Sequence, residues 1–414
     1  MPSESPNLLL VSVIFGLTYV ALAVGKAPGL RMDRAGIALV GAAAMLVCGV
    51  LDLHAAAKAV DYETIVLLFG MMVVAAYLKL SGFFSLATEK IAAHCSGPQT
   101  LLAVIIALGG VLSAFLVNDV VCVAMTPLVL GLCRSLKRPA IPYLVGLATA
   151  SNVGSVATIT GNPQNMIIGS LSGISYLRFS ARLAPIALAG LVLDFLIVAW
   201  IYRKSLGETV EYAFGPSYAA RPRVHRFLLV KSVGATLVTV GLFFAGQPIA
   251  LVALGAAGFL MLDRVRPEKI YREIDWPLLV MFAGLFVVVR AFEINVVRTW
   301  GLEQLPALHD SPVVLVSGLS LVLSNLVSNV PAVLLFKPLM EAMPHPEPAW
   351  LALAMSSTLA GNLTVLGSVA NLIVVESARR SGTQLGFFEY LKVGVPLTLL
   401  TTLVGVAWLA LTHY

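Results

Sequence analysis

The chain has 414 residues, of which 59% are hydrophobic and only 12% are charged, and its mean hydropathy is +0.93. A soluble globular chain carries roughly 25% charged residues, so this composition excludes an ordinary water-soluble domain. The net charge of +6 could indicate nucleic-acid binding, but the Lys and Arg residues lie in loops between apolar runs, which membrane topology explains better. We expect an all-α polytopic membrane protein with the lipid bilayer, and no nucleic acid, as a partner.

The apolar segments form two sets of six, separated by a polar and basic linker at 204–226. The first set lies near 8–25, 35–52, 63–80, 100–133, 142–174 and 180–202. The second set lies near 227–246, 248–263, 275–292, 311–340, 350–377 and 388–412. In each set the fourth and fifth segments are interrupted by polar residues. The sequence therefore predicts an internal duplication, with a first repeat at 1–203 and a second repeat at 227–414.

Three landmarks recur in the same order in the two sets. The third segments share an Asp followed by an aromatic residue and a later Gly, at Asp61-Tyr62…Gly70 and Asp275-Trp276…Gly284. The fourth segments align Ser113, Asn118 and Thr126-Pro127 with Ser324, Asn329 and Lys337-Pro338. The fifth segments both contain Thr-x-x-Gly-x-x-x-Asn, at 158–165 and 364–371. Three ordered matches favour a duplication over chance similarity among apolar helices.

The fourth segment of each set, at 100–133 and 311–340, is too long for one crossing and too short for two, which need about 40 residues. We predict that each forms a re-entrant helical hairpin with its polar tip at membrane depth. Each repeat then has five transmembrane helices plus one hairpin, and an odd number of crossings makes the repeats inverted. With this topology most of the Lys and Arg residues face one side, which the positive-inside rule makes cytoplasmic. The linker is then cytoplasmic, and both termini lie outside the cell's inner (plasma) membrane.

The fifth segments, at 142–174 and 350–377, are predicted to be broken helices. Irregular backbone at membrane depth is tolerated only where it is buried in protein or lines a cavity, and two such breaks at corresponding places indicate a transporter's binding site. Freed backbone groups, hydroxyls and carboxamides there can bind an ion or a small oxyanion. The alternative is that these residues only hold helices together. The candidate site residues of the two breaks are Thr158, Thr160, Gly161, Asn162, Asn165, Thr364, Gly367, Ser368 and Asn371.

The hairpin tips supply a second group of candidates, Asn118 with Asp119 and Ser328 with Asn329. An intramembrane carboxylate is costly and is by default a functional residue. Asp119 could hold Na⁺ or the exchanged proton, with Asn118 and Asn329 as further candidate Na⁺ ligands; alternatively, it caps a helix end. Asp194 and Lys337 are additional coupling candidates, which could instead form a structural pair.

No sequence motif of an enzyme is present: there is no HExxH, Walker loop, GxGxxG unit or nucleophile elbow. The four cysteines have no metal-ligand spacing. We therefore expect a protein that is not an enzyme and has no cofactor apart from Na⁺ or H⁺ as a coupling ion.

The Thr160–Asn165 stretch, the Asn118-Asp119…Thr126-Pro127 hairpin and the Ser328-Asn329-Val330-Pro331 tip resemble the ion-transporter superfamily. That group includes arsenite permeases of the ArsB type, NhaD-type Na⁺/H⁺ antiporters, citrate–metal symporters and divalent-anion/Na⁺ symporters. The Asn-Asp pair followed by Thr-Pro is most similar to the arsenite-permease branch and to related anion permeases. The resemblance implies inverted repeats, an elevator-type movement of a transport domain against a scaffold, and a homodimer.

The sequence and the resemblance together predict a secondary active transporter that moves a small inorganic ion or oxyanion, coupled to H⁺ or Na⁺. A Na⁺/H⁺ antiporter is one alternative. A Na⁺-coupled dicarboxylate symporter is another, although the hairpin tips match the Ser-Asn-Thr tips of those symporters only in part. A channel or a membrane scaffold without transport is the alternative from a different class. The substrate, its direction of movement and the coupling stoichiometry do not follow from the residues.

Overall fold

The computed structural model describes residues 8–24, 32–95, 97–210, 224–297 and 311–412, and this part of the chain is helical throughout, with no strand. The first half contains α1 (Leu8–Val24), α2 (Arg34–Val47), α3 (Leu53–Ala59), α4 (Tyr62–Ser81), α5 (Phe83–His94), α6 (Pro98–Phe115), α7 (Asn118–Ser135), α8 (Ala140–Ser155), η1 (Ile159–Gly161), α9 (Pro163–Ser172), α10 (Tyr176–Ile201) and η2 (Ser205–Gly207). The second half contains α11 (Arg226–Phe244), α12 (Ile249–Met261), α13 (Pro267–Tyr271), α14 (Trp276–Asn295), α16 (Pro312–Val327), α17 (Asn329–Glu341), α18 (Glu347–Ala360), η5 (Val365–Gly367), α19 (Val369–Arg380) and α20 (Phe387–Leu411). From α11 onwards the second series repeats the order of the first, except that α5 and η2 have no counterpart among the described elements.

Seven of the described helices are long and apolar enough to cross a membrane, namely α4, α6, α7, α10, α11, α14 and α20. The two interrupted segments of each half take the predicted forms. Helices α6 and α7 are the arms of one hairpin and α16 and α17 of the other, while α8–α9 and α18–α19 are helices broken by a short 3-10 turn. This architecture confirms the predicted all-α fold with two inverted repeats.

The structure adds a helix between the third and fourth predicted segments, where residues 83–94 form α5. Gly82 adopts the left-handed conformation (φ 85°) and ends α4, with its backbone N–H bonded to the Leu78 and Lys79 carbonyls. The chain therefore turns sharply and begins a new helix there.

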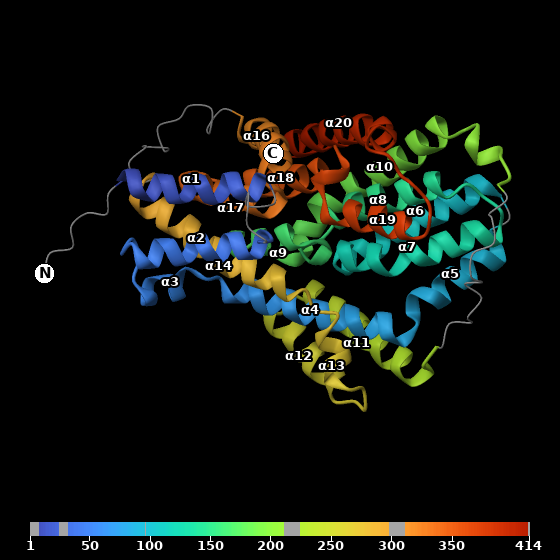
Figure 1. Cartoon of the computed structure of the whole chain (residues 1–414), viewed down its shortest axis with the longest axis horizontal. Coiled ribbons are helices and arrows are strands. Elements are labelled where there is room, and N and C mark those ends of the chain that lie inside the picture. The colour runs from blue at the N-terminus through green and yellow to red at the C-terminus, as the bar shows by residue number, and fades with distance from the viewer. Residues whose placement is uncertain (1–7, 25–31, 96, 211–223, 298–310, 413–414) are drawn as a thin grey trace, which may run out of the picture.

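The duplication is visible in the packing between the two halves, because corresponding helices of each half pack against the other half. Helix α4 of the first half packs against α12, and α14 of the second half packs against α2, as Figure 1 shows for segments far apart in sequence. Both crossings depend on the glycines that were aligned in the sequence. A Cβ at Gly70 would lie 2.7 Å from the Ala253 backbone, and one at Gly284 would lie 2.8 Å from the Ala38 backbone. Only glycine allows the helices to approach this closely.

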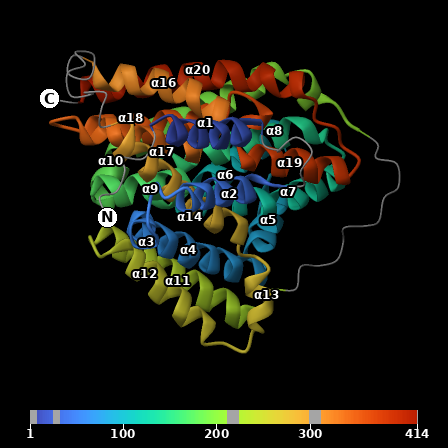
Figure 2. The same cartoon turned by 60° about the vertical axis from the view of Figure 1, so that its left-hand side comes forward.

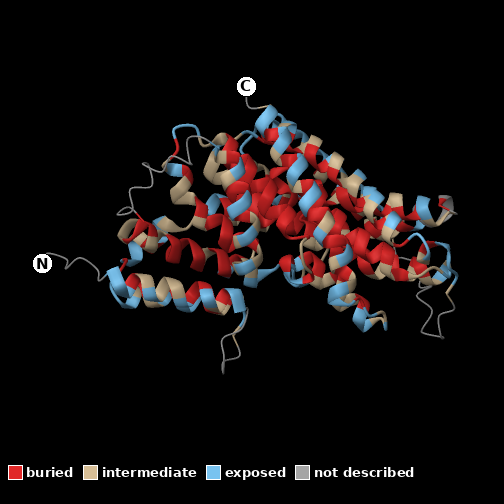
Figure 3. Cartoon of the chain, turned by 90° about the horizontal axis from the view of Figure 1, so that it is seen from above, coloured by how far each residue is buried: buried red, intermediate tan, exposed pale blue. Residues whose placement is uncertain are grey.

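The helices separate into two bundles. Helices α1–α4 and α11–α14 pack mainly on one another and form what we call the scaffold bundle; the two hairpins, the two broken helices, α10 and α20 form the central bundle. In Figure 2 the scaffold helices α3, α4, α11 and α12 lie below and α16, α18 and α20 lie above. Figure 3 shows the most buried residues gathered on the helices in the middle of the molecule. The hairpin tips and the broken helices, which carry the predicted site residues, all belong to the central bundle.

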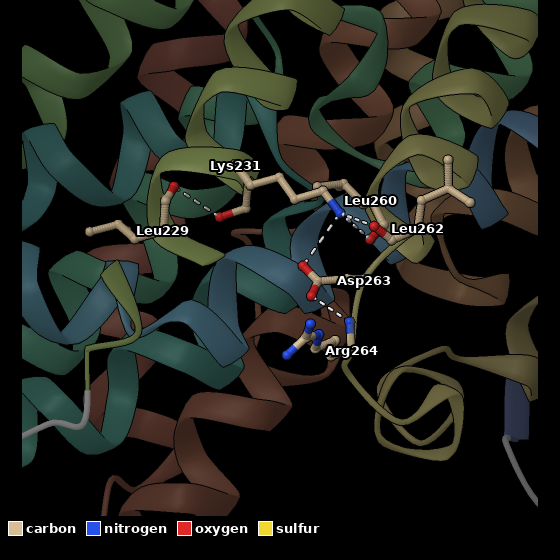
Figure 4. A network of polar contacts seen from close by, with 7 residues as sticks. Leu229, Lys231, Leu260, Leu262, Asp263 and Arg264 are labelled. Atoms are coloured by element: carbon tan, nitrogen blue, oxygen red, sulfur yellow. Dashed lines mark hydrogen bonds and ion pairs between the residues drawn. The ribbon is translucent and has the colours of Figure 1, made fainter. Parts of the chain in front are cut away.

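A polar network closes one end of the scaffold bundle (Figure 4). The Lys231 ammonium group on α11 donates to the Leu260 and Leu262 carbonyls at 3.0 and 2.8 Å and lies 3.3 Å from the Asp263 carboxylate. A cation at a helix C-terminus satisfies carbonyls that have no intrahelical partner. Lys231 thus fixes the end of α12 against α11.

Candidate functional site

We call residues 156–162 the first break and 361–368 the second break. In the first, a Cβ on Gly161 would lie 2.2 Å from the Ser155 carbonyl oxygen, so only glycine fits the turn. Asn165 then satisfies the carbonyls that the break frees: its Nδ2 donates to the carbonyls of Ser155 and Thr158, each at 3.0 Å. These two bonds, which we call the first brace, explain why Gly and Asn occur at this spacing.

The second break is held in the same way. Nδ2 of Asn371 donates to the Gly361 and Thr364 carbonyls at 2.7 and 3.1 Å. These carbonyls occupy the positions of Ser155 and Thr158 in the other repeat, so we call the pair of bonds the second brace. Asn165 and Asn371 are both fully buried. Their Nδ2 groups therefore bond to the protein backbone, and the two residues hold the breaks in place without lining the cavity.

Each break is also bonded to the opposite broken helix. Asn152 on α8 donates to Asn371 Oδ1 at 3.1 Å and accepts from the Ser368 hydroxyl at 3.0 Å. At the equivalent position on α18, Thr358 accepts from Asn162 Nδ2 at 3.1 Å and donates to Asn165 Oδ1 at 3.3 Å. The two breaks are thus joined at the centre of the molecule into one hydrogen-bonded unit.

The first hairpin tip is bonded to this unit, and each tip has an amide oxygen without a hydrogen-bond partner in the described residues. Asn118 Nδ2 donates to Asn152 Oδ1 at 3.0 Å. The amide oxygens of Asn118 and Asn329, both of which are buried, have no partner in the described part of the chain. Buried polar atoms are normally satisfied, so two free carbonyl oxygens at the tips are suited to a bound cation.

A cavity of 530 Å³ opens beside the tips and breaks. Of the predicted site residues, it is lined by Asn118, Asp119, Ser328, Asn329, Gly367 and Ser368. The first turns of α7, α9, α17 and α19 all border it, and helix N-termini carry partial positive charge. These four ends favour an oxyanion.

Asp119 lines the same cavity at the start of α7. The carboxylate of Asp275 in the scaffold bundle lines the same cavity. At the equivalent position of the other hairpin tip stands Val330, so the charge occurs in one repeat only. Two carboxyl groups that line one cavity favour the binding of a proton or a cation there.

The sequence did not reveal a basic residue at the cavity, but the structure brings one from the scaffold bundle. Arg34, in the first turn of α2, lines the cavity, and its Nη1 lies 3.4 Å from the Ser328 hydroxyl. Ser328 has a positive φ of 78°, which is strained for a residue other than glycine. A sequence clue was available, since Asp33-Arg34 sits where an apolar helix begins. Nothing in the spacing placed it opposite a hairpin tip almost 300 residues away.

The other predicted residues lie outside the cavity lining. The Thr158 hydroxyl donates to the Ala114 carbonyl, and that of Thr160 bonds to Tyr176 at 2.8 Å. Lys337 pairs with Glu293 of the scaffold bundle at 3.4 Å, while Asp194 bonds to Thr149. The structure therefore does not bring Asp194 and Lys337 together. The described residues contain no group of three or more His, Cys, Asp or Glu side chains that could hold a metal ion.

Comparisons with known proteins agree with this architecture. A family model described as "Citrate transporter" matches residues 19–355. The silicon efflux transporter LSI3 of rice, Oryza sativa, is 31% identical, and the match covers 97% of each chain. A transporter named arsB from Dictyostelium discoideum is 27% identical over 91% of this chain and 87% of its own. The inner membrane protein YbiR of Escherichia coli is 29% identical over 84% of this chain and 87% of its own.

A solved structure has the same fold. The YdaH transporter of Alcanivorax borkumensis superposes with a TM-score of 0.63, covering 99% of this chain and 97% of that chain. The two sequences are only 17% identical, so this likeness concerns the arrangement of helices alone.

Proposed function

Because the chain belongs to the citrate transporter family, a family of membrane transporters, we propose that it is a secondary active transporter for a small inorganic ion or oxyanion in the cell's inner membrane. The observation that supports this proposal most is that the cavity is lined by groups of both positive and negative charge. Arg34 and four helix N-termini face an oxyanion, and Asp119 with the free amide oxygens of Asn118 and Asn329 faces a cation or proton. A site that binds substrate and coupling ion side by side couples their movements.

The side from which the cavity opens follows from the proposed topology. Val24, Asp33 and Asp275 lie at the cavity, next to loops whose Lys and Arg residues place them in the cytoplasm. The structure then represents a state open to the cytoplasm, with both termini outside and the 204–226 linker inside. Transport would proceed by an elevator movement, in which the central bundle slides along the scaffold bundle and carries the tips and breaks with it.

Asp119 is the residue that we assign to the coupling ion. Its oxygen atoms, with the Asn118 and Asn329 amide oxygens, provide either a Na⁺ site or a proton site. The second candidate function, a Na⁺/H⁺ antiporter, is favoured by these same oxygens and has no use for Arg34. A dicarboxylate symporter is less consistent, because one Arg at the cavity is outnumbered by Asp33, Asp119 and Asp275.

The test measures uptake of arsenite, silicic acid, citrate and Na⁺ into proteoliposomes under imposed pH or Na⁺ gradients. We expect one of the first two solutes to be driven by a gradient, and Asp119→Asn to abolish that gradient-driven accumulation. Asp52→Asn, which preserves an exposed helix cap on α3 at a residue that does not line the cavity, serves as the matched control and retains transport. Gradient-driven accumulation that survives in folded Asp119→Asn protein would exclude Asp119 as the coupling residue. Movement of Na⁺ and H⁺ alone would favour the antiporter.

The repeat bounds at 1–203 and 227–414 and the homodimer remain predictions. The mass of the protein in nanodiscs, measured by mass photometry, tests the dimer. A particle with one chain per disc at all protein concentrations would contradict it.

A further inference from the structure

A second carboxyl group is buried in the central bundle, away from the cavity. Asp194 lies in the middle of α10, a helix long enough to cross the membrane, and its exposure is 0%. It is not among the residues that line the 530 Å³ cavity. Within the described residues no Lys, Arg or His nitrogen forms an ion pair with it, and its Oδ2 has no hydrogen-bond partner. An ionised carboxylate in such a place is strongly disfavoured.

The hydrogen bonds around Thr149 indicate where a proton lies. The Thr149 hydroxyl oxygen is 2.8 Å from the Val145 carbonyl, one helical turn back, and also 2.8 Å from Asp194 Oδ1. A hydroxyl has a single hydrogen to donate but two lone pairs to accept with. If it donates to Val145, the contact with Asp194 is a hydrogen bond only when the carboxyl is the donor. Both short contacts are satisfied together when Asp194 carries a proton.

The helices packed against α10 supply no counter-charge. Helix α6 has no ionisable side chain, and the charged groups on the others are exposed at helix ends or paired elsewhere, as Lys231 is with Asp263 and Glu347 with Arg178. The ionisable residues on α10 itself and on the α8, α11, α18 and α20 helices are Tyr143, Tyr176, Arg178, Arg182, Arg226, Lys231, Glu347, Glu389, Tyr390 and Lys392. Tyr390 alone shares the buried surroundings of Asp194, and a tyrosine is neutral near pH 7.

We propose that Asp194 is a second proton-binding site of this transporter, connected to the cavity by a chain of buried amides. The Thr149 carbonyl accepts from Asn362 Nδ2 at 3.1 Å, and Asn362 Oδ1 accepts from Asn152 Nδ2 at 2.8 Å. Asn152 Oδ1 accepts from Asn118 at the hairpin tip at 3.0 Å. Loss of the proton turns the Thr149 hydroxyl towards Asp194 and releases the Val145 carbonyl, which disturbs α8 next to the first break. Sodium is a poorer occupant, because a hard cation needs several oxygen ligands, and Thr149 is the one hydrogen-bond partner of the Asp194 side chain within the described residues.

Infrared spectroscopy of the purified full-length protein in nanodiscs tests the protonation without any transport. We expect the wild type at pH 7 to show the C=O stretching band of a protonated carboxyl group that is missing in Asp194→Asn. The band should shift in Asp194→Glu, remain in Asp119→Asn, and be unaffected by Na⁺. The proposal is overturned if Asp194→Asn loses intensity in the ionised carboxylate band, relative to the wild type, and keeps the band of the protonated carboxyl group. It is also overturned if Na⁺ removes the protonated band from the wild-type spectrum.

The coupling role rests on the proposed function and is measured separately. In proteoliposomes, the number of protons moved per arsenite or silicic acid should fall in Asp194→Asn and recover in Asp194→Glu. An unchanged proton ratio overturns the coupling role. Wild-type protein that moves neither solute refutes the proposed function, while the infrared result on Asp194 stands independently.

Discussion

The two repeats hold the backbone of their breaks in the same way but place different side chains at the cavity. Asn165 and Asn371 make the same pair of bonds to equivalent carbonyls, so the backbone at each break is fixed in the same way. Two residues at the cavity differ from their counterparts in the other repeat: Asp119 corresponds to Val330 at the hairpin tips, and Arg34 corresponds to Ile249 on the scaffold bundle. The duplicated fold therefore keeps the residues that hold its broken helices, while the residues at the cavity differ between the repeats.

The braces should give the largest effect. Asn165→Ala and Asn371→Ala each remove two hydrogen bonds to backbone carbonyls of a break, and each such bond contributes about 0.5–1.5 kcal/mol. We expect both variants to lower the thermal midpoint in detergent strongly and to a similar degree. Asn295→Ala, which removes one bond from a half-buried Asn to its own helix on α14, is the matched control and should change the midpoint little. If only one of Asn165→Ala and Asn371→Ala lowers the thermal midpoint, the two breaks are not held in an equivalent way.

The asymmetry of charge is tested at Arg34. Arg34→Gln removes the one Arg that lines the cavity among the described residues, and loss of a charge-assisted hydrogen bond worth about 1.5–3 kcal/mol weakens substrate binding roughly ten- to a hundredfold. The mirror variant, Ile249→Gln, lies on the scaffold helix of the opposite half and should leave uptake near the wild-type value. Substrate affinity is measured from the concentration dependence of flux in proteoliposomes. Equal losses of substrate affinity in Arg34→Gln and Ile249→Gln would contradict the assignment of the substrate to the cavity that Arg34 lines.

The smallest effect is expected at the tip itself. Ser328 has φ 78°, whereas Val117, which precedes the other helical arm, has φ −56°. Glycine adopts a positive φ without strain, so Ser328→Gly should stabilise the fold by about 1 kcal/mol. Val117→Gly gains nothing from its backbone and loses a buried side chain, so its thermal midpoint should fall. A lower midpoint for Ser328→Gly would show that the hydroxyl contact with Arg34 outweighs the strain.

Much of this protein could be predicted from local and repeated patterns. Apolar runs longer than a soluble helix needs indicated the membrane, and the repeated Thr-x-x-Gly-x-x-x-Asn indicated broken helices, because a helix interrupted at membrane depth must have its freed groups satisfied. The Asn of that motif performs this task within its own segment, ten residues or fewer from the carbonyls it bonds. Gly70 and Gly284 likewise mark helix crossings that alignment of the halves had already paired.

What only the tertiary structure decided is which groups face one another across the bundles. Arg34 meets Ser328, Lys337 meets Glu293 rather than Asp194, and Asp194 meets Thr149. None of these pairs has a sequence spacing that a helix or turn would enforce, since they depend on how separate helices stack. The sequence by itself determined a duplicated helical transporter with two breaks and an intramembrane acid. The packing of its bundles determined which charges the cavity presents and which carboxyl is left buried without a counter-charge.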